Sequence, residues 1–173
     1  MRKPDVNDNE YVEYIRQIPE KFHPKIVIHR AFNRLKDYNL GGVHLSSTNR
    51  PEKPESPDGK ILSTSCHSFD EVETLPKEYT HCFLSPIFPS ISKHDYGNIL
   101  DRNELREFLE KERKVKVIGL GGVNHRRLHD FKGYFFDGFA VLGAAWGSNP
   151  EIEKNIENNF QKIYECVMSD HIV

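Results

Sequence analysis

Short apolar segments alternate with amphipathic segments along almost the whole chain, and this alternation restricts the fold more than any other feature. The apolar segments have the length and residue types of buried strands, and they are Lys25–His29, Gly42–Ser46, Ile61–His67, Thr80–Ser85, Val115–Gly119 and Gly138–Gly143. Strands that alternate with helices indicate a parallel sheet, either doubly wound or closed into a barrel. The sequence therefore predicts an α/β fold.

The amphipathic segments predict the helices of this fold. One covers about Asp8–Ile18, and a second begins at Ser68, which has capping-box spacing to Glu71, and stops at Pro76. A third covers Arg102–Arg113. The last helix has apolar residues at helical spacing, which are expected to face the core: Ile152, Ile156, Phe160, Ile163, Tyr164 and Val167.

Composition excludes several classes of protein. A length of 173 residues fits one domain, and a formal net charge of −2 argues against a dedicated nucleic-acid-binding protein. No apolar run approaches the roughly 18 residues that a membrane span needs, so no membrane segment is expected. The three cysteines, Cys66, Cys82 and Cys166, are widely spaced and predict neither a disulfide framework nor a zinc site. This pattern favours a cytoplasmic protein.

Two glycine-rich segments follow the last two predicted strands. The first, Gly119–Asn124, contains Gly121 and Gly122 and leads into a predicted helix, so that its backbone N–H groups could face an anion. The second contains Leu142 and Gly143. Loops at these two places commonly hold a phosphate in barrels. Glycines also occur in such turns for geometry alone, and only the pair together predicts a phosphate site.

A third segment follows the Thr80–Ser85 strand and carries Ser90, Ser92 and Lys93. Two hydroxyl groups and an ammonium group within four residues could bind an oxyanion. The alternative is a surface loop rich in serine and proline with an exposed lysine, and the residues alone favour that alternative.

Each histidine could likewise have either a functional or a structural role. His67 ends a strand, where it could act as a general acid or base or could fix the loop by a hydrogen bond. The pleat directs Cys66 to the opposite face, so a thiol–imidazole pair is not expected. His29 and His44 also end strands and are expected to be structural. His125 and His129 have ligand spacing on a helix but lack a third ligand, so a solvated helix face is expected and no metal site is predicted.

Several motifs together resemble one known family. Their order and spacing are similar to those of the thiamine phosphate synthase/TenI family, and they are Gly42–Leu45, Ser65–Ser68, Ser85–Lys93, Gly119–Gly122 and Asp137–Gly143. The resemblance covers nearly the whole chain, because Arg2-Lys3-Pro4 resembles the end of the family's second strand.

The resemblance implies a TIM (β/α) barrel with a phosphate site at its C-terminal mouth. The synthases of this family join hydroxymethylpyrimidine diphosphate to thiazole phosphate, whereas TenI-type members tautomerise thiazole phosphate. By resemblance, His67 and Lys93 are the candidate catalytic residues. The substrate-binding residues implied are Arg2, His29, Ser65, Ser90, Ser92, Lys93, Gly121, Gly122, Leu142 and Gly143.

The departures from the family pattern concern the metal and the proton-transferring group. Magnesium is expected for the family, but His29-Arg30 stands where synthases carry Asn-Asp, and Asn49 stands where they carry a second aspartate. One hypothesis is therefore that positive side chains neutralise the charge of the departing diphosphate in place of a metal ion. The candidates are Arg2, Arg30 and Lys93. For the tautomerase, His67 matches one family histidine, but Pro86 stands at the position of the one that transfers the proton.

When the chain is aligned with the family pattern, its first residues match the end of the family's second strand. A single barrel domain over residues 1–173 would lack the first strand-helix-strand unit, through a misplaced start codon or a trimmed chain. Two open parallel edges would then favour pairing with another chain, so a homo-oligomer is a further expectation.

The sequence thus predicts a thiamine-biosynthesis protein similar to a synthase, a transferase, with thiazole phosphate and pyrimidine diphosphate as its small-molecule partners. One alternative is a TenI-like tautomerase, and another is a non-catalytic regulatory protein that binds thiazole or thiamine phosphate. An unrelated phosphate-binding barrel, such as a sugar-phosphate epimerase, would need paired inward aspartates at strand ends, and the sequence does not show them.

Overall fold

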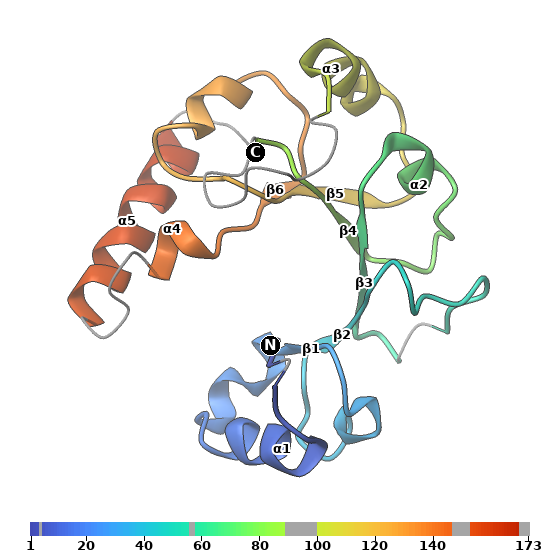
Figure 1. Cartoon of the computed structure of the whole chain (residues 1–173), viewed down its shortest axis with the longest axis vertical. Helices are drawn as coiled ribbons and strands as arrows, with labels where there is room; N and C mark the ends of the chain where they lie inside the picture. Colours follow the sequence, from blue (N-terminus) through green and yellow to red (C-terminus); the bar gives the residue numbers. More distant parts are fainter. Residues whose placement is uncertain (4, 56–57, 89–99, 147–152, 170–173) are drawn as a thin grey trace. The chain divides into compact units, whose positions relative to one another are not determined.

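The computed structural model describes residues 1–3, 5–55, 58–88, 100–146 and 153–169, with side chains from 155 onward in the last range. The chain forms two compact units (Figure 1). Unit 1 comprises Met1–Ser65 and Leu75–His81, and unit 2 comprises Cys66–Thr74 and Cys82–Val173. The six described strands follow one another in the sheet in the order β1-β2-β3-β4-β5-β6. This parallel arrangement with intervening helices confirms the predicted α/β class.

Unit 1 consists of helix α1 (Asp8–Arg16), the 3-10 helices η1 (Glu20–Lys25) and η2 (Phe32–Arg34), and strands β1 (Val27–Ile28), β2 (Gly42–Leu45) and β3 (Ile61–Cys66), whose last residue is counted with unit 2. Strand β2 pairs in parallel with both β1 and β3. Helix α1 begins at a capping box formed by Asn7 and Glu10. Its Tyr11 and Ile15 side chains are fully buried, which fixes the helix against the strands.

Unit 2 contains helix α2 (Phe69–Glu73), strand β4 (His81–Leu84), helix α3 (Arg102–Glu110), strand β5 (Lys116–Gly119), the 3-10 helix η3 (Leu128–Phe131), strand β6 (Gly138–Phe139) and helices α4 (Gly143–Trp146) and α5 (Glu153–Ser169). Strand β5 pairs in parallel with β6, and the Leu120 amide donates to the Leu84 carbonyl at 3.0 Å. Helices α2 and α3 lie on one side of β4 and β5 (Figure 1). Phe69 stacks on Phe108 between these helices, with ring centroids 4.8 Å apart.

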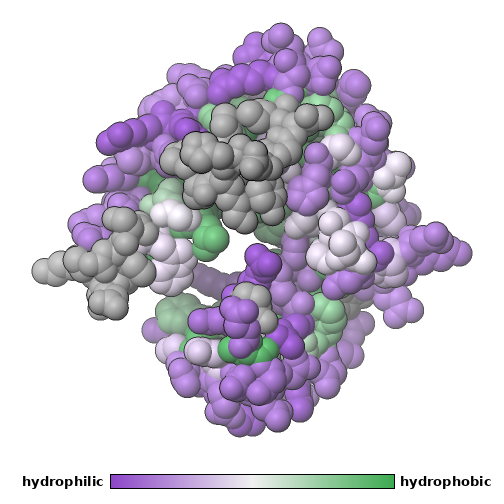
Figure 2. All heavy atoms as spheres, viewed as in Figure 1, coloured by the Kyte–Doolittle hydropathy of each residue, from purple (hydrophilic) through white to green (hydrophobic). Residues whose placement is uncertain are grey.

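The core of unit 2 is centred on the fully buried ring of Phe131. Its neighbours contact it edge-on or tilted, as aromatic quadrupoles favour, and they are Phe88, Tyr134, Phe136 and Phe139. The surface over α1 and α3 is by contrast almost entirely hydrophilic (Figure 2). Among the described residues, no helix is both long and apolar enough to cross a membrane.

Three predicted boundaries were wrong for reasons that periodicity does not reveal. Lys25 belongs to η1 and not to a strand, because the buried His23 ring bonds the backbone carbonyls of Ile15, Ile18 and Tyr38 and holds a tight turn there. The strand predicted to reach Gly143 ends at Phe139, and Gly143 begins α4. The helix expected directly after Asn124 is replaced by a turn and the short η3.

The apolar stripe of the last helix was also only partly correct. Ile163 is buried as predicted, but Phe160 is 56% exposed and Tyr164 is 49% exposed. Helical spacing identifies one face of a helix, but it does not say how much of that face another element covers. In the second and third predicted helices the outcome was better, because Ser68 caps α2 and the predicted face of α3 (Leu105, Phe108 and Leu109) is buried.

Candidate functional site

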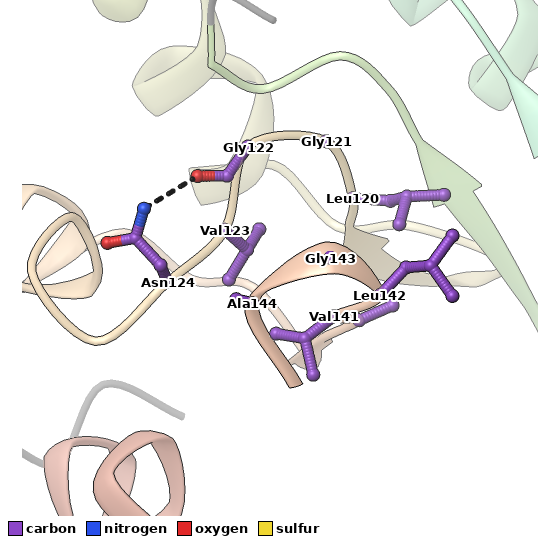
Figure 3. Close-up of a pocket in the computed structure, with 10 residues that line it drawn as sticks. Leu120, Gly121, Gly122, Val123, Asn124, Val141, Leu142, Gly143 and Ala144 are labelled. Atoms are coloured by element: carbon purple, nitrogen blue, oxygen red, sulfur yellow. Dashed lines mark hydrogen bonds between the residues drawn. The ribbon is translucent and has the colours of Figure 1, made fainter. Parts of the chain in front are cut away.

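The two glycine-rich segments of unit 2 line a single cavity of about 450 Å³ (Figure 3). One wall is the loop Leu120–Asn124, which follows β5, and the other is Ala140–Ala144, which follows β6. The two segments meet because β5 and β6 are parallel neighbours, so their carboxyl ends lie at the same edge. The cavity therefore brings together Gly121, Gly122, Leu142 and Gly143, all four predicted for a phosphate site.

Only glycine fits the first wall without strain. Gly121 and Gly122 have φ angles of 97° and 68°, in the left-handed region that other residues rarely occupy. A Cβ atom on Gly121 would also lie 3.0 Å from the Cα atom of Pro86. The loop is thus packed tightly on the segment after β4, and the Ile87 amide donates to the Leu120 carbonyl at 3.0 Å.

Gly143 has a different role in the second wall. A Cβ atom at this position would meet nothing within 4 Å, so the fold itself does not require glycine there. The absence of a side chain instead leaves the cavity open beside α4.

The side chain of Asn124 shapes the turn that replaces the expected helix. Its Oδ1 atom accepts hydrogen bonds from the Arg126 and Arg127 amides at 3.0 and 3.2 Å, and its Nδ2 atom donates to the Gly122 carbonyl at 3.5 Å (Figure 3). Because no α-helix starts within this described turn, the helix that was predicted to follow it was wrong, and no helix N-terminus faces the cavity from this loop. Backbone N–H groups are what the loop can offer to an anion.

His67 lies on the surface of unit 2, just after β3. Its Nδ1 atom is 2.9 Å from the backbone carbonyl of Ser85. A carbonyl can only accept, so Nδ1 carries the hydrogen, and in the neutral ring the lone pair is on Nε2. The sequence left two roles open for His67, fixing the loop by a hydrogen bond or acting as a general acid or base. The side chain can do both, because Nδ1 makes the bond to the loop and Nε2 remains basic.

The neighbouring thiol takes no part in such chemistry. Cys66 is fully buried, and it contacts Cys82, whose pKa is raised by the hydrogen bond to Cys66 and by burial. Buried thiols of raised pKa are poor nucleophiles. The predicted residues Ser90, Ser92 and Lys93 lie outside the described residues, which resume at Leu100.

Unit 1 contains a polar cluster centred on His44 of β2, which is 6% exposed. Its Nδ1 and Nε2 atoms lie 3.0 Å from the hydroxyl oxygens of Ser63 and Ser65 on β3. The parallel register places His44 directly opposite Ser63, which explains the first contact. Ser65 was predicted as a site residue, but its link to His44 was not.

The ring of His29, which follows β1, packs on the ring of His44, with centroids 4.5 Å apart. The pKa of both imidazoles is lowered to about 4, by burial first and then by neighbouring positive charges, among them that of Arg2. The two rings are therefore neutral near pH 7.

Three arginines border this cluster. Arg2 acts on both histidines through its charge. Arg50 donates from NH1 to the Ser65 carbonyl at 3.3 Å. Arg30 is bound by Asp8, with Nε 2.8 Å from Oδ1, and by the Val6 carbonyl. Arg50 was not among the predicted site residues; its position just after the turn that follows β2 is the signal that could have identified it.

The described residues contain no group of three or more His, Cys, Asp or Glu side chains that could hold a metal ion. Next to β1, the carboxylate of Asp8 is engaged by Arg30. This donor set does not suit magnesium, which prefers several oxygen ligands of negative charge.

Known proteins resemble the chain in both sequence and structure. A family model described as "Thiamine monophosphate synthase" matches residues 1–145. The thiamine-phosphate synthase of Clostridium botulinum is 23% identical over 172 residues, which are 95% of this chain and 78% of that protein. The corresponding synthase of Clostridium beijerinckii is 24% identical, over 86% of this chain and 73% of its own length.

Two solved structures resemble the fold. The thiamine phosphate pyrophosphorylase of Bacteroides thetaiotaomicron aligns with a TM-score of 0.76 and 29% identity, covering 97% of this chain and 82% of that one. The thiamine phosphate pyrophosphorylase of Pyrococcus furiosus aligns with a TM-score of 0.73 and 18% identity, covering 96% and 82%. These likenesses confirm the fold class predicted from the sequence.

Proposed function

The chain belongs to the thiamine monophosphate synthase family, and from this premise we propose that it acts in thiamine biosynthesis by binding thiazole phosphate in the cavity of unit 2. The observation that carries the proposal is the convergence of two glycine-rich loops on one cavity of about 450 Å³. That volume suits a small ligand. The backbone N–H groups of the Gly121–Gly122 turn would hold the phosphate, because an oxyanion accepts several such bonds at once.

The rest of the cavity suits the ring of the ligand. The side chains of Leu120 and Leu142 point to the same side of the two loops (Figure 3). Leu142 is 68% exposed, so an apolar ring that covers it would remove hydrophobic surface from water. A flat heterocycle with a phosphate tail has both of the features that this cavity can recognise.

The proposed reaction is that of a transferase: thiazole phosphate takes the place of the diphosphate of hydroxymethylpyrimidine diphosphate, which gives thiamine phosphate and releases pyrophosphate. His67 and Lys93 are the proposed catalytic residues, and Arg2, His29, Ser65, Ser90 and Ser92 are proposed to contact the substrates. By the family resemblance, His29-Arg30 and Asn49 stand where synthases carry their magnesium ligands. Arg30 carries positive charge and is bound by Asp8, so this position does not suit a magnesium ion.

A second function is favoured by one observation. The Nδ1–H group of His67 is fixed on the Ser85 carbonyl, which leaves Nε2 of the exposed ring to exchange a proton with a substrate. That arrangement suits a tautomerase acting on thiazole phosphate. Loss of tautomerase activity in His67→Asn, with thiazole phosphate binding retained, would support this second function; unchanged activity would exclude it.

The main proposal is tested by titrating the protein with thiazole phosphate and measuring the increase in its melting temperature. The wild type is compared with the variants Gly143→Ala and Gly133→Ala. Gly143→Ala adds a methyl group to the cavity but meets no protein atom within 4 Å, so it should weaken binding about tenfold at unchanged stability. Gly133 has a φ of 81° and does not line the cavity. Gly133→Ala should therefore lower stability and leave the affinity unchanged.

Absence of stabilisation by thiazole phosphate in the wild type would contradict the proposal. Formation of thiamine phosphate after addition of pyrimidine diphosphate distinguishes a synthase from a non-catalytic thiazole phosphate-binding protein. The assay is done with EDTA and with magnesium, because the cation requirement is a separate question.

A further inference from the structure

We propose that Asn124 is a positioning residue of the cavity in unit 2, and that it directs the backbone N–H group of Val123 toward the bound phosphate. The inference rests on the proposed function for the identity of the ligand, a phosphate ester. It deepens that function by naming one donor and the side chain that orients it. The glycines of this loop were predicted site residues, whereas neither Asn124 nor Val123 was.

The orientation of the Asn124 side chain is fixed by its own hydrogen bonds. Its Oδ1 atom accepts from the Arg126 and Arg127 amides at 3.0 and 3.2 Å. An N–H group needs an acceptor, so these two bonds identify which end of the side-chain amide is the oxygen. The Nδ2 atom therefore faces the Gly122 carbonyl, to which it donates at 3.5 Å. This bond is long, and what it fixes is the direction of the carbonyl.

The direction of the Gly122 carbonyl determines the direction of the next N–H group. In a trans peptide group the C=O and N–H bonds point to opposite sides. The Gly122 carbonyl is directed toward the Asn124 side chain, on the side away from Leu142 (Figure 3). The Val123 N–H group is therefore directed to the opposite side, toward the space between the two loops that line the cavity.

The fold leaves the Val123 amide available to a ligand. Val123 is 5% exposed, and no backbone carbonyl among the described residues accepts from its N–H group. Buried N–H groups are nearly always paired with a protein group or with water. A phosphate oxygen in the cavity would supply the acceptor that this donor lacks.

Two other turns of the chain show that the turn itself does not need the Nδ2 atom. At the start of α1, Asn7 Oδ1 accepts from the amides two and three residues later, at 3.0 Å each. At the start of α3, Asp101 Oδ1 makes the same pair of bonds at 2.9 and 3.1 Å. A carboxylate can therefore hold such a turn. What Asn124 adds, and an aspartate cannot, is a donor for the Gly122 carbonyl.

The test compares Asn124→Asp with Asn7→Asp, because both substitutions keep the two amide bonds and add the same charge. Asn7 belongs to unit 1 and does not line the cavity. Calorimetric titration with thiazole phosphate should show about tenfold weaker binding by Asn124→Asp, at a nearly unchanged melting temperature. Asn7→Asp should bind like the wild type. Equal weakening in the two variants would overturn the inference, because the added charge alone would then explain it.

A second titration separates the direction of the N–H group from repulsion by the new carboxylate. The Debye length falls to about 3 Å in about 1 M salt, so a loss of affinity that arises from repulsion should largely disappear there. A loss that arises from a misdirected N–H group should persist, relative to the wild type in the same salt. Recovery of wild-type affinity by Asn124→Asp in this salt would overturn the inference.

A measurement on the wild type does not depend on how any variant folds. In an amide NMR titration with thiazole phosphate, and separately with inorganic phosphate, the Val123 amide proton should shift downfield, because it enters a charge-assisted hydrogen bond. The same shift should be absent in Asn124→Asp. A purely structural role of Asn124 would leave this signal of the variant like that of the wild type.

The outcomes distinguish this inference from the proposed function. Binding of thiazole phosphate with an unshifted Val123 amide, or with equal affinity in wild type and Asn124→Asp, would overturn the inference and leave the proposed function standing. If inorganic phosphate shifts the Val123 amide while thiazole phosphate does not bind, the proposed function fails and the N–H group remains an anion donor. If neither ligand binds, both fail.

Discussion

The backbone amide of His29 lies 3.3 Å from the hydroxyl oxygen of Tyr11. This contact joins the end of β1 to a fully buried ring on α1, and the same hydroxyl donates to the Met1 carbonyl. One side chain thus connects three segments of unit 1.

Tyr11→Phe should therefore lower the stability of the chain. The ring packing is retained, but two backbone groups lose a partner, at a cost of about 1–3 kcal/mol in the free energy of unfolding. Urea denaturation measures this cost. Tyr14→Phe is the control, because the Tyr14 ring is 39% exposed, and an equal loss in both variants would contradict the role of the buried hydroxyl.

The stability of the chain should fall as the pH drops from about 6.5 to about 4. The pKa of both His29 and His44 is lowered to about 4, by burial first and by neighbouring positive charges. In this range the unfolded state binds more protons than the folded state, so the stabilisation is complete above pH 6.5 and is lost progressively below it. The pH dependence of the urea midpoint across this range should be weaker in the double variant His29→Gln/His44→Gln. An unchanged pH dependence would refute the assignment of this effect to the two histidines.

Gly121→Ala should destabilise unit 2 more than a glycine-to-alanine change at a position of positive φ without steric crowding. The residue has a φ of 97°, and its new Cβ atom would lie 3.0 Å from Pro86 Cα, so strain and crowding together should cost about 2–4 kcal/mol. Gly59→Ala is the matched control, since Gly59 has a φ of 75° with nothing within 4 Å of the added atom. Thermal denaturation should show a clearly larger decrease for Gly121→Ala.

Arg113→Gln should cost more than the removal of an exposed ion pair. Arg113 NH2 bonds the Phe135 carbonyl at 2.9 Å and Asp137 Oδ2 at 3.3 Å, and its side chain is 15% exposed. Loss of these bonds would leave the partly buried Asp137 carboxylate, which is 28% exposed, without its cationic partner, at about 1–3 kcal/mol.

The matched control for that pair is Arg102→Gln. Arg102 and Asp130 are 3.2 Å apart at 50% and 48% exposure, so their separation should cost less than about 1 kcal/mol in urea denaturation. Equal costs for the two variants would mean that burial does not distinguish the pairs.

Two positions of α5 test whether its apolar stripe is covered. Ile163 is 7% exposed, whereas Phe160 is 56% exposed. Ile163→Ala should therefore lower the free energy of unfolding by about 2–4 kcal/mol, and Phe160→Ala by less than about 1 kcal/mol. A larger cost for Phe160→Ala in chemical denaturation would show that another surface packs on this ring in solution.

The sequence by itself determined features that depend on neighbouring residues. The cap at Ser68, the buried face of α3 and the glycine turn at Gly121–Gly122 all arise from residues within four positions of each other, where periodicity and backbone preference are visible. The parallel arrangement of the strands followed from the alternation of strands and helices, whereas their order in the sheet did not.

Only the tertiary structure decided the contacts that give the site its chemistry. His44 meets Ser63 and Ser65 across a strand register, and Arg50 reaches the Ser65 carbonyl from a loop. The partial exposure of Phe160 likewise depends on what packs against α5. Such contacts join residues many positions apart, and their geometry comes from strand register and from packing, which no local pattern encodes.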